Sequence, residues 1–219
     1  MNKLKSQDTD KLISQLKHAS SPIDAISAIT AISDSKTIEA GAIATLIQAL
    51  SHHHPSVRNT ATEALVKLAP ATVEPLIAAF RTSSDQGLQA YIIQALAQIG
   101  VPTTLDLLSE VLGTAVANHC QGNVRRIAAR GLGRIGSTAK DPEIIRHAVE
   151  KLSWALVTPE DWGLRYAAAV SLQEIATPEA CAFLQVAQNQ EPDKVVLSRI
   201  TLALEQVKGT GDWGLGIGD

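Results

Sequence analysis

The sequence predicts an all-α fold, an α-α superhelix of about six stacked helical hairpins. A pair of small and apolar residues recurs six times, at spacings of 31 to 40 residues. Small or apolar residues also lie three positions before and, in most repeats, four positions after each pair, so that each set forms one helical stripe. Self-similarity at this period is typical of solenoids, in which neighbouring repeats bury one another's apolar faces. The pairs are Ala31-Ile32, Ala64-Leu65, Ala95-Leu96, Gly131-Leu132, Ser171-Leu172 and Ala203-Leu204.

Composition agrees with stacked aliphatic helices. Hydrophobic residues make up 45% of the 219 residues, yet aromatic residues make up only 3%. The repeat runs on without a linker, so we expect one HEAT-like solenoid domain over residues 1–208. Residues 209–219 contain five glycines and are expected to form a flexible tail.

Each repeat reads as two helices. Prolines such as Pro22, Pro55, Pro142 and Pro178 fall at the proposed helix openings, where proline is favoured. Gly100 and Gly136 are expected to follow second helices in a left-handed conformation. First helices are predicted near residues 9–19, 37–51, 71–81, 103–117, 142–157 and 178–190. Second helices are predicted near residues 22–33, 55–69, 86–99, 123–136, 162–176 and 193–207.

Charge and residue patterns exclude several classes of protein. The net charge of −3 and the lack of a basic stripe argue against nucleic-acid binding. No apolar run approaches the roughly 20 residues of a membrane span, and the polar start lacks a secretory signal, so we expect a cytoplasmic protein. His52, His53 and His54 read as a solvated turn or a metal site. No second cluster supports metal, and we predict no metal site and no permanently bound cofactor.

The two longest spacings fall in repeats 4 and 5, where the least generic residues lie. The polar sextet 118–123 and the stretch 158–166 are both expected to form turns that lead into second helices, on one edge of the solenoid. Helix N-termini and arginines there favour an anion. The aliphatic faces of second helices, including Ile92, Ile93 and Ile200, lead us to expect a partner that covers part of the chain.

Aromatic residues gather at the same place. Trp154, Trp162 and Tyr166 are three of the seven aromatic residues in the chain. Cations beside flat rings suit a large planar acid, and Asp161 can accept hydrogen bonds from its ring N–H groups. Two structural alternatives stay open: the arginines that follow valine or leucine can belong to a ladder between repeats, and Trp154 can be a core residue.

Two motifs carry a resemblance to a known family. Val57-Arg58, Val124-Arg125 and Leu164-Arg165, each followed by small residues, resemble HEAT repeats over residues 9 to 207. The sextet 118–123 with residues 124–132, and the stretch 154–168, resemble the E/F-type phycobilin lyases. Length and repeat layout are most similar to the smaller, F-type (beta) subunit of the heterodimeric phycocyanobilin lyase acting on the phycocyanin alpha subunit.

The resemblance implies a lyase that works as a heterodimer with an E-type (alpha) subunit. The pair would carry phycocyanobilin, as substrate, and promote thioether formation with a cysteine of the phycocyanin alpha subunit. Its work would be orientation, which can supply roughly 7–11 kcal/mol of a barrier. The candidate residues divide into a catalytic set, His119, Cys120 and Asp161, and a bilin-binding set, Asn118, Gln121, Asn123, Arg125, Arg126, Trp154, Trp162, Arg165 and Tyr166.

Alternatives remain at the level of single residues and of the whole protein. His119 is a candidate proton relay. Cys120 either holds the bilin transiently or makes a polar contact within the turn. The chain could also be a relative that isomerises the bilin during attachment, one that detaches bilins, or a scaffold or chaperone for phycobiliproteins without chemistry of its own.

Overall fold

The computed structural model describes residues 2–35, 39–114, 119–158 and 161–210, without the side chains of residues 2–8, 119–121 and 208–210. Every element in these ranges is helical, which confirms the predicted all-α class. The chain divides into two compact units, residues 1–99 and 100–219. The expectation of one continuous domain over residues 1–208 stays a prediction.

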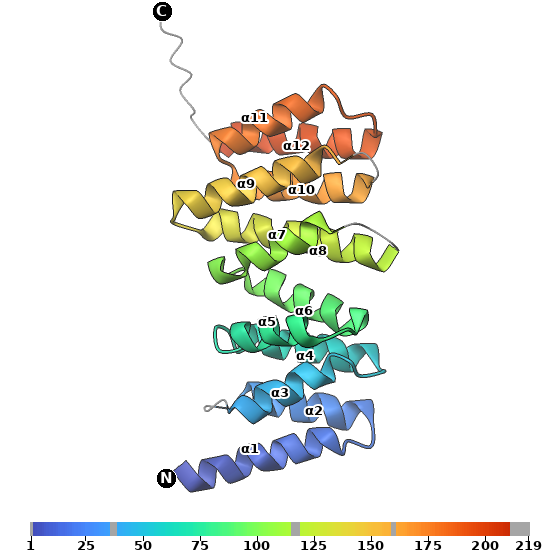
Figure 1. The fold of residues 1–219 in the computed structure, drawn as a ribbon, viewed down its shortest axis with the longest axis vertical. Helices are drawn as coiled ribbons and strands as arrows, with labels where there is room; N and C mark the ends of the chain where they lie inside the picture. Colours follow the sequence, from blue (N-terminus) through green and yellow to red (C-terminus); the bar gives the residue numbers. More distant parts are fainter. Residues whose placement is uncertain (1, 36–38, 115–118, 159–160, 211–219) are drawn as a thin grey trace, which may run out of the picture. The chain divides into compact units, whose positions relative to one another are not determined.

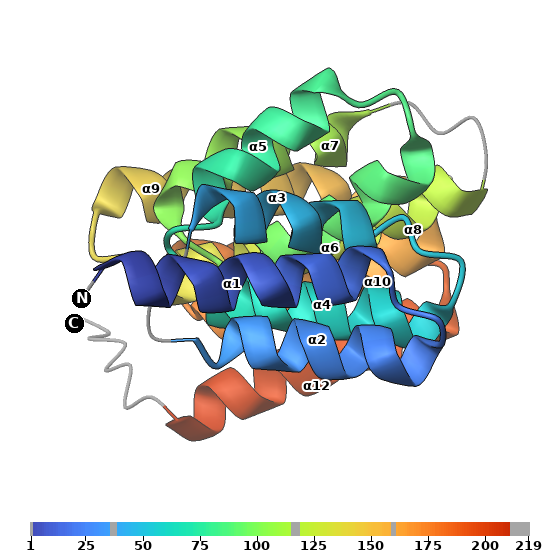
Figure 2. The same cartoon turned by 90° about the horizontal axis from the view of Figure 1, so that it is seen from below.

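Unit 1 contains three helical hairpins in two layers. The first helices of the hairpins, α1, α3 and α5, lie side by side, as do the second helices, α2, α4 and α6. Figure 2 shows α3 and α5 above α2 and α4. The helices are α1 (Asn2–Lys17), α2 (Pro22–Ser33), α3 (Ala40–Ala49), α4 (Pro55–Lys67), α5 (Val73–Thr82) and α6 (Gln86–Ile99).

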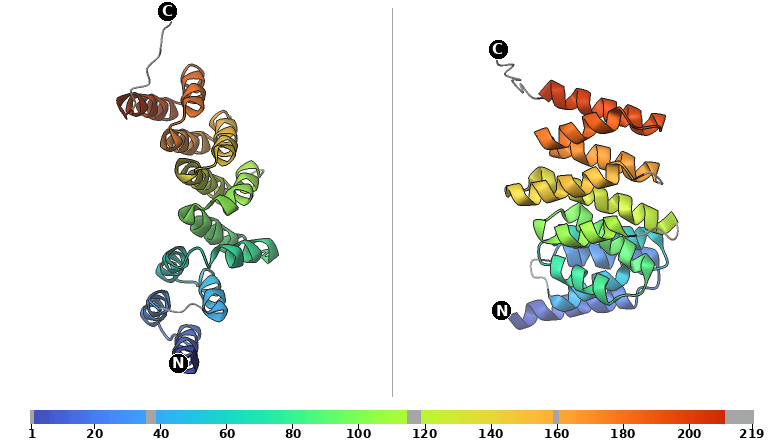
Figure 3. Two further views of the ribbon diagram at one scale, coloured as in Figure 1. Left: turned by 90° about the vertical axis from the view of Figure 1, so that its left-hand side faces the viewer. Right: turned by 45° about the horizontal axis from the view of Figure 1, so that its top comes forward.

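Unit 2 repeats the same plan. Its first helices α7, α9 and α11 form one layer and its second helices α8, α10 and α12 the other, as Figure 1 shows. The left view of Figure 3 looks nearly along the helices and shows the hairpins as paired coils. The elements are the 3-10 turn η1 (Pro102–Thr104), α7 (Leu105–Gly113), α8 (His119–Thr138), α9 (Pro142–Leu156), α10 (Trp162–Ile175), α11 (Pro178–Gln188) and α12 (Lys194–Thr210).

The helix starts follow from local sequence. Pro22, Pro55, Pro142 and Pro178 each occupy the first position of a helix, as predicted, because proline lacks the N–H that would have no partner there. Side chains cap several of these starts: Ser21, Asp141 and Thr177 accept hydrogen bonds from backbone N–H groups of the first turn. Such caps explain why the second helices begin close to the predicted residues.

The repeated pairs form the core of both units. Ile32, Leu65, Leu96, Leu132, Leu172 and Leu204 are all buried. The second-helix residues Ile92, Ile93 and Ile200 are also fully buried, within units 1 and 2 respectively. The expectation that a partner covers these three residues is therefore wrong, because the chain's own neighbouring helices already do so.

The two glycines predicted to end helices behave differently. Gly100 has a φ of +65°, as predicted for a left-handed position after a helix. Gly136 instead lies inside α8, and the prediction for it is wrong. A Cβ atom there would lie 2.6 Å from Ile175 Cδ1, so this glycine allows α8 and α10 to approach closely. The left-handed residue after α10 is Ala176, with a φ of 52°.

Candidate functional site

The two sequence motifs open the helices α8 and α10, which lie side by side in unit 2. The sextet was expected to form a turn, but α8 begins at His119, so residues 119–123 are helical. That part of the prediction is wrong: polar residues are tolerated in a first helical turn, where the N–H groups face outward. Asn118 and the side chains of His119, Cys120 and Gln121 lie outside the described part, whereas the side chain of Asn123 is described and exposed.

An ion pair joins the openings of the two helices. Arg126 of α8 donates to Oδ1 of Asp161 from Nη2 at 2.8 Å and from Nε at 3.2 Å. Asp161 also caps α10 by accepting a hydrogen bond from the Leu164 N–H at 2.9 Å. The guanidinium lies against Gly163, where a Cβ would come within 2.6 Å of it. The second motif therefore needs glycine at this position so that Arg126 can reach Asp161.

The electrostatics of Asp161 follow from these contacts. Burial by itself would raise the pKa of Asp161. The hydrogen bonds from Arg126 and the Leu164 N–H, with the charges of Arg126 and Arg125, outweigh burial and leave that pKa lowered. Asp161 is therefore a carboxylate at neutral pH, able to accept but not to donate a proton in a hydrogen bond.

Arg125 and Arg165 are buried and engaged by the protein itself. Arg125 Nε donates to the Leu112 carbonyl at 2.8 Å, and its guanidinium lies 5.8 Å from the Trp154 ring centre. Arg165 makes a two-pronged ion pair with Glu191, at 2.8 and 2.9 Å, and donates to the Thr158 carbonyl. Both arginines link elements of unit 2, which is the ladder role that the sequence left open. Their bilin-binding role stays a prediction.

The three aromatic side chains are exposed but lie on two different layers. Trp162 and Tyr166, 53% and 38% exposed, are one turn apart on α10. Trp154, 48% exposed, lies on the first helix α9 and lines a cavity of about 210 Å³ with residues of α7 such as Ser109 and Leu112. Trp162 and Tyr166 thus share a face with the ion pair's helices, whereas Trp154 belongs with Arg125.

Several residues that hold the site together were not predicted. Ser171 of α10 is fully buried and donates to the Ala129 carbonyl of α8 at 3.0 Å. Arg130 of α8 donates to Ser171 and forms an ion pair with Glu174. Ser171 occupies the position where other repeats have alanine or glycine, and this departure from the repeat was the available signal.

The histidine cluster lies in unit 1 and makes local contacts. Arg58 donates to the carbonyls of His52 and His53, at 2.6 and 2.9 Å, and the two imidazole rings are stacked 4.2 Å apart. Burial, followed by the neighbouring histidines, lowers the pKa of His52. Across the described residues, no group of three or more His, Cys, Asp or Glu side chains is placed to hold a metal ion.

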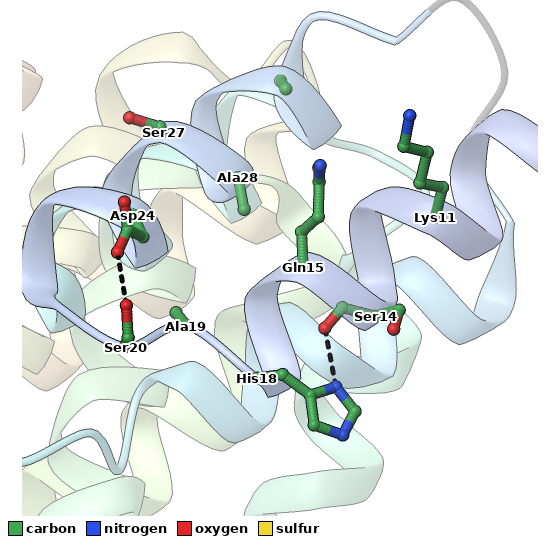
Figure 4. Close-up of a pocket in the computed structure, with 10 residues that line it drawn as sticks. Lys11, Ser14, Gln15, His18, Ala19, Ser20, Asp24, Ser27 and Ala28 are labelled. Carbon is green, nitrogen blue, oxygen red and sulfur yellow. Dashed lines mark hydrogen bonds between the residues drawn. The ribbon is translucent and has the colours of Figure 1, made fainter.

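A separate cavity of about 720 Å³ lies between α1 and α2 of unit 1. Figure 4 shows its lining, in which Ser20 donates to Asp24 and His18 is bonded to the Ser14 carbonyl. None of the predicted site residues belongs to it. In the ranges that the structure describes, no helix is long and apolar enough to cross a membrane.

Comparison with known proteins places this geometry in a family. The HEAT repeats model matches residues 9–73, 73–144 and 111–205. Over 202 residues, covering 91% of this chain and 95% of the relative, the chain is 66% identical to the bilin biosynthesis protein PecF of Mastigocladus laminosus. Over 177 residues, covering 75% of this chain and 81% of the relative, it is 32% identical to the phycocyanobilin lyase subunit beta of Thermosynechococcus vestitus.

A solved structure agrees with these relatives. The complex of CpcE and CpcF of phycocyanin lyase from Nostoc contains a chain that matches with a TM-score of 0.65 and 30% identity, covering 75% of this chain and 99% of that one. Fold, sequence motifs and relatives point to one assignment. The chain belongs to the HEAT-repeat family of beta-type bilin lyase subunits.

Proposed function

We propose that this chain is the beta-type subunit of a heterodimeric lyase that attaches an open-chain tetrapyrrole to a cysteine of a phycobiliprotein alpha subunit. The observation that carries the proposal is the meeting of the two family motifs at the adjoining starts of α8 and α10, joined by the Arg126–Asp161 ion pair. The E-type partner is supported by the structural neighbour, which was solved as a complex of CpcE and CpcF.

The chemistry asks the lyase for orientation more than for a nucleophile. The acceptor's thiol loses its proton, its sulfur bonds to the exocyclic ethylidene carbon of ring A, and a proton goes to the ring carbon of the former double bond. His119, in the first turn of α8, is the candidate to relay that proton. Asp161, held as a carboxylate, would accept hydrogen bonds from pyrrole N–H groups and so fix the substrate.

The identity of the bilin and of the acceptor divides the proposal into two candidates. The first is addition of phycocyanobilin to the phycocyanin alpha subunit without further change, by analogy with the relatives named phycocyanobilin lyase subunit beta. The second is addition with isomerisation of the bilin. The pattern of identities favours the second: 66% and 64% to two proteins named PecF, but 26–36% to those named phycocyanobilin or phycocyanin lyase subunits.

The test is co-expression of this chain with a bilin-making pathway, an E-type partner and candidate acceptors, with each component omitted in turn. We expect a covalent, fluorescent adduct only with the complete set. A blue-shifted product identifies isomerisation, because a double-bond shift shortens the conjugated system, whereas an unshifted product identifies simple addition. Release of bilin from a loaded acceptor would instead identify the detaching relative. No adduct with any acceptor would leave only the scaffold role and refute the proposal.

Point variants locate the chemistry. We expect His119→Ala and Cys120→Ala to reduce adduct formation while the thermal melt followed by circular dichroism stays unchanged. If only His119→Ala slows the reaction, Cys120 is a contact residue and holds no bilin. Attachment at the wild-type rate by both variants would contradict the assignment of the reaction to the start of α8.

A further inference from the structure

The second helices of the last two hairpins, α10 and α12, form a continuous face in unit 2. Two contacts fix their relative position: the Arg165–Glu191 ion pair near the start of both helices, and a hydrogen bond between Gln173 and Gln206 farther along. The second contact pairs residues that are 33 positions apart. Residues of α10 are therefore opposite residues of α12 with numbers about 33 higher.

Exposed apolar side chains lie along this face on both helices. Opposite Trp162 and Tyr166, the 33-residue register places Val195 and Arg199, with Leu202 one turn farther along α12. Val195 and Leu202 are exposed, although both are large apolar residues. From Trp162 to Gln173 the strip is about 16 Å long at 1.5 Å per helical residue, and the two helix axes are about 8–10 Å apart. A contiguous exposed apolar strip of this kind marks a binding surface.

Arg199 differs from the other arginines of unit 2 described above. Arg126, Arg130 and Arg165 each form an ion pair with a carboxylate, and Arg125 donates to a carbonyl. Among the described residues Arg199 has no such ion pair, and its buried Nε has no hydrogen-bond partner. A buried N–H group without an acceptor is costly, and a carboxylate can accept from Nε and one Nη of a guanidinium together.

We propose that the α10–α12 face holds the open-chain tetrapyrrole, with Trp162 and Tyr166 against its flat ring system and Arg199 paired with a propionate. Val195 and Leu202 provide the apolar wall on α12. The inference rests on the proposed function for the identity of the substrate, and it adds the sixth repeat to the site. An elongated flat molecule with acidic side groups matches an elongated apolar strip that contains one unpaired cation.

The position of the strip agrees with the chemistry. Trp162 is the first residue of α10, directly after Asp161. A tetrapyrrole along the strip would therefore bring one end to the adjoining starts of α8 and α10. The reacting end ring would meet Asp161 there, while the rest of the molecule is held along α10 and α12.

The first experiment measures binding to the complex of this chain with its E-type partner. Phycocyanobilin is titrated and its absorbance and induced circular dichroism are followed. Tyr166→Ala is compared with Phe183→Ala, because both side chains are 38% exposed but Phe183 lies on α11. Val195→Glu is compared with Val186→Glu, at 56% and 55% exposed, for the same reason. We expect Tyr166→Ala and Val195→Glu to raise Kd about tenfold or more, and the α11 controls to leave it within about twofold.

A second arm tests the role assigned to Arg199. Arg199→Gln should raise Kd for phycocyanobilin about tenfold, yet leave Kd for its dimethyl ester unchanged, because the ester has no carboxylates. The matched control is Arg146→Gln, on α9, which should change neither value. Equal losses for the acid and the ester would overturn the propionate contact.

Attachment to the acceptor is measured in parallel, so that the two proposals fail separately. If the face variants bind bilin like the wild type while the wild type still forms adduct, the tetrapyrrole binds elsewhere and this inference is wrong. If the variants weaken assembly with the E-type partner at unchanged bilin affinity, the face is a protein interface and the inference is also wrong. Binding that follows the face variants, without any transfer to an acceptor, would support the face and refute the lyase function.

Discussion

Replacing Gly163 by alanine tests how the two motifs are held together. The new Cβ would lie 2.6 Å from both Nε and Cζ of Arg126. These atoms belong to the end of a flexible side chain, so the guanidinium can move away without a shift of the backbone. Its two hydrogen bonds to Asp161 would then break, and the starts of α8 and α10 would no longer be joined.

The expected loss of stability is small. The Arg126 side chain is 41% exposed, so solvent screening limits the contribution of its pair with Asp161 to about 1 kcal/mol. Alanine in place of glycine within a helix stabilises by up to about 1 kcal/mol. The two effects offset each other, and we expect the free energy of unfolding to stay within about 1 kcal/mol of the wild type. The pKa of Asp161 should rise, because burial persists while the contribution of Arg126 is lost.

Two measurements check this prediction. Urea unfolding followed by circular dichroism gives the stability, and NMR titration of the Asp161 carboxyl carbon gives the direction of its pKa change. Gly113→Ala is the matched control, since a Cβ there meets nothing within 4 Å. An unchanged pKa would mean that Arg126 still reaches Asp161. A loss above about 3 kcal/mol would mean that the backbone had to shift. Either result would refute the reasoning.

Three further predictions concern the frame of unit 2. Glu191→Gln should cost about 3–5 kcal/mol in urea unfolding because it leaves the buried Arg165 without its partner, whereas Glu174→Gln, in an exposed pair, should cost at most about 1 kcal/mol; equal losses would contradict the distinction. Gly133→Ala should cost about 1–3 kcal/mol, because its Cβ would lie 2.5 Å from Ser171 Cβ and 2.9 Å from Ser171 Cα; unchanged stability would show that α8 and α10 can separate freely. Asp161 has a lowered pKa in the folded state, so its contribution to stability is present above its unfolded pKa of about 4 and is lost as the pH falls below that value. The difference in unfolding free energy between wild type and Asp161→Asn should therefore shrink between about pH 4 and pH 2, and a difference that is constant across this range would be inconsistent with that account.

Local and periodic features determined most of the fold. The small and apolar residues at helical spacing predicted twelve helical segments, and each lies close to a helix in the structure. Residues such as Leu65, Leu132 and Leu172 are buried as the stripe required. Prolines at first positions and Gly100 at a positive φ mark helix ends, because their backbone preferences act within one or two residues.

The start of α8 shows where local signals were insufficient. Polar residues from His119 to Asn123 read equally well as a turn or as a first helical turn, since neither conformation requires their burial. Gly136 likewise reads as a helix end by local preference. Only the neighbouring α10 explains it, because Ile175 occupies the space that a side chain would need.

By itself, the sequence determined the helical repeat and the two family motifs, because period and motif are properties of neighbouring residues in the chain. Only the tertiary structure decided the partners of the long charged side chains: Arg126 with Asp161, and Arg165 with Glu191 from the next hairpin. An arginine can reach several carboxylates, and its choice depends on how closely the helices approach. The same holds for the α10–α12 register, which places Arg199 opposite Tyr166. That register is set by packing between hairpins, where the spacing of repeats in sequence varies and the contact between helices selects one alignment.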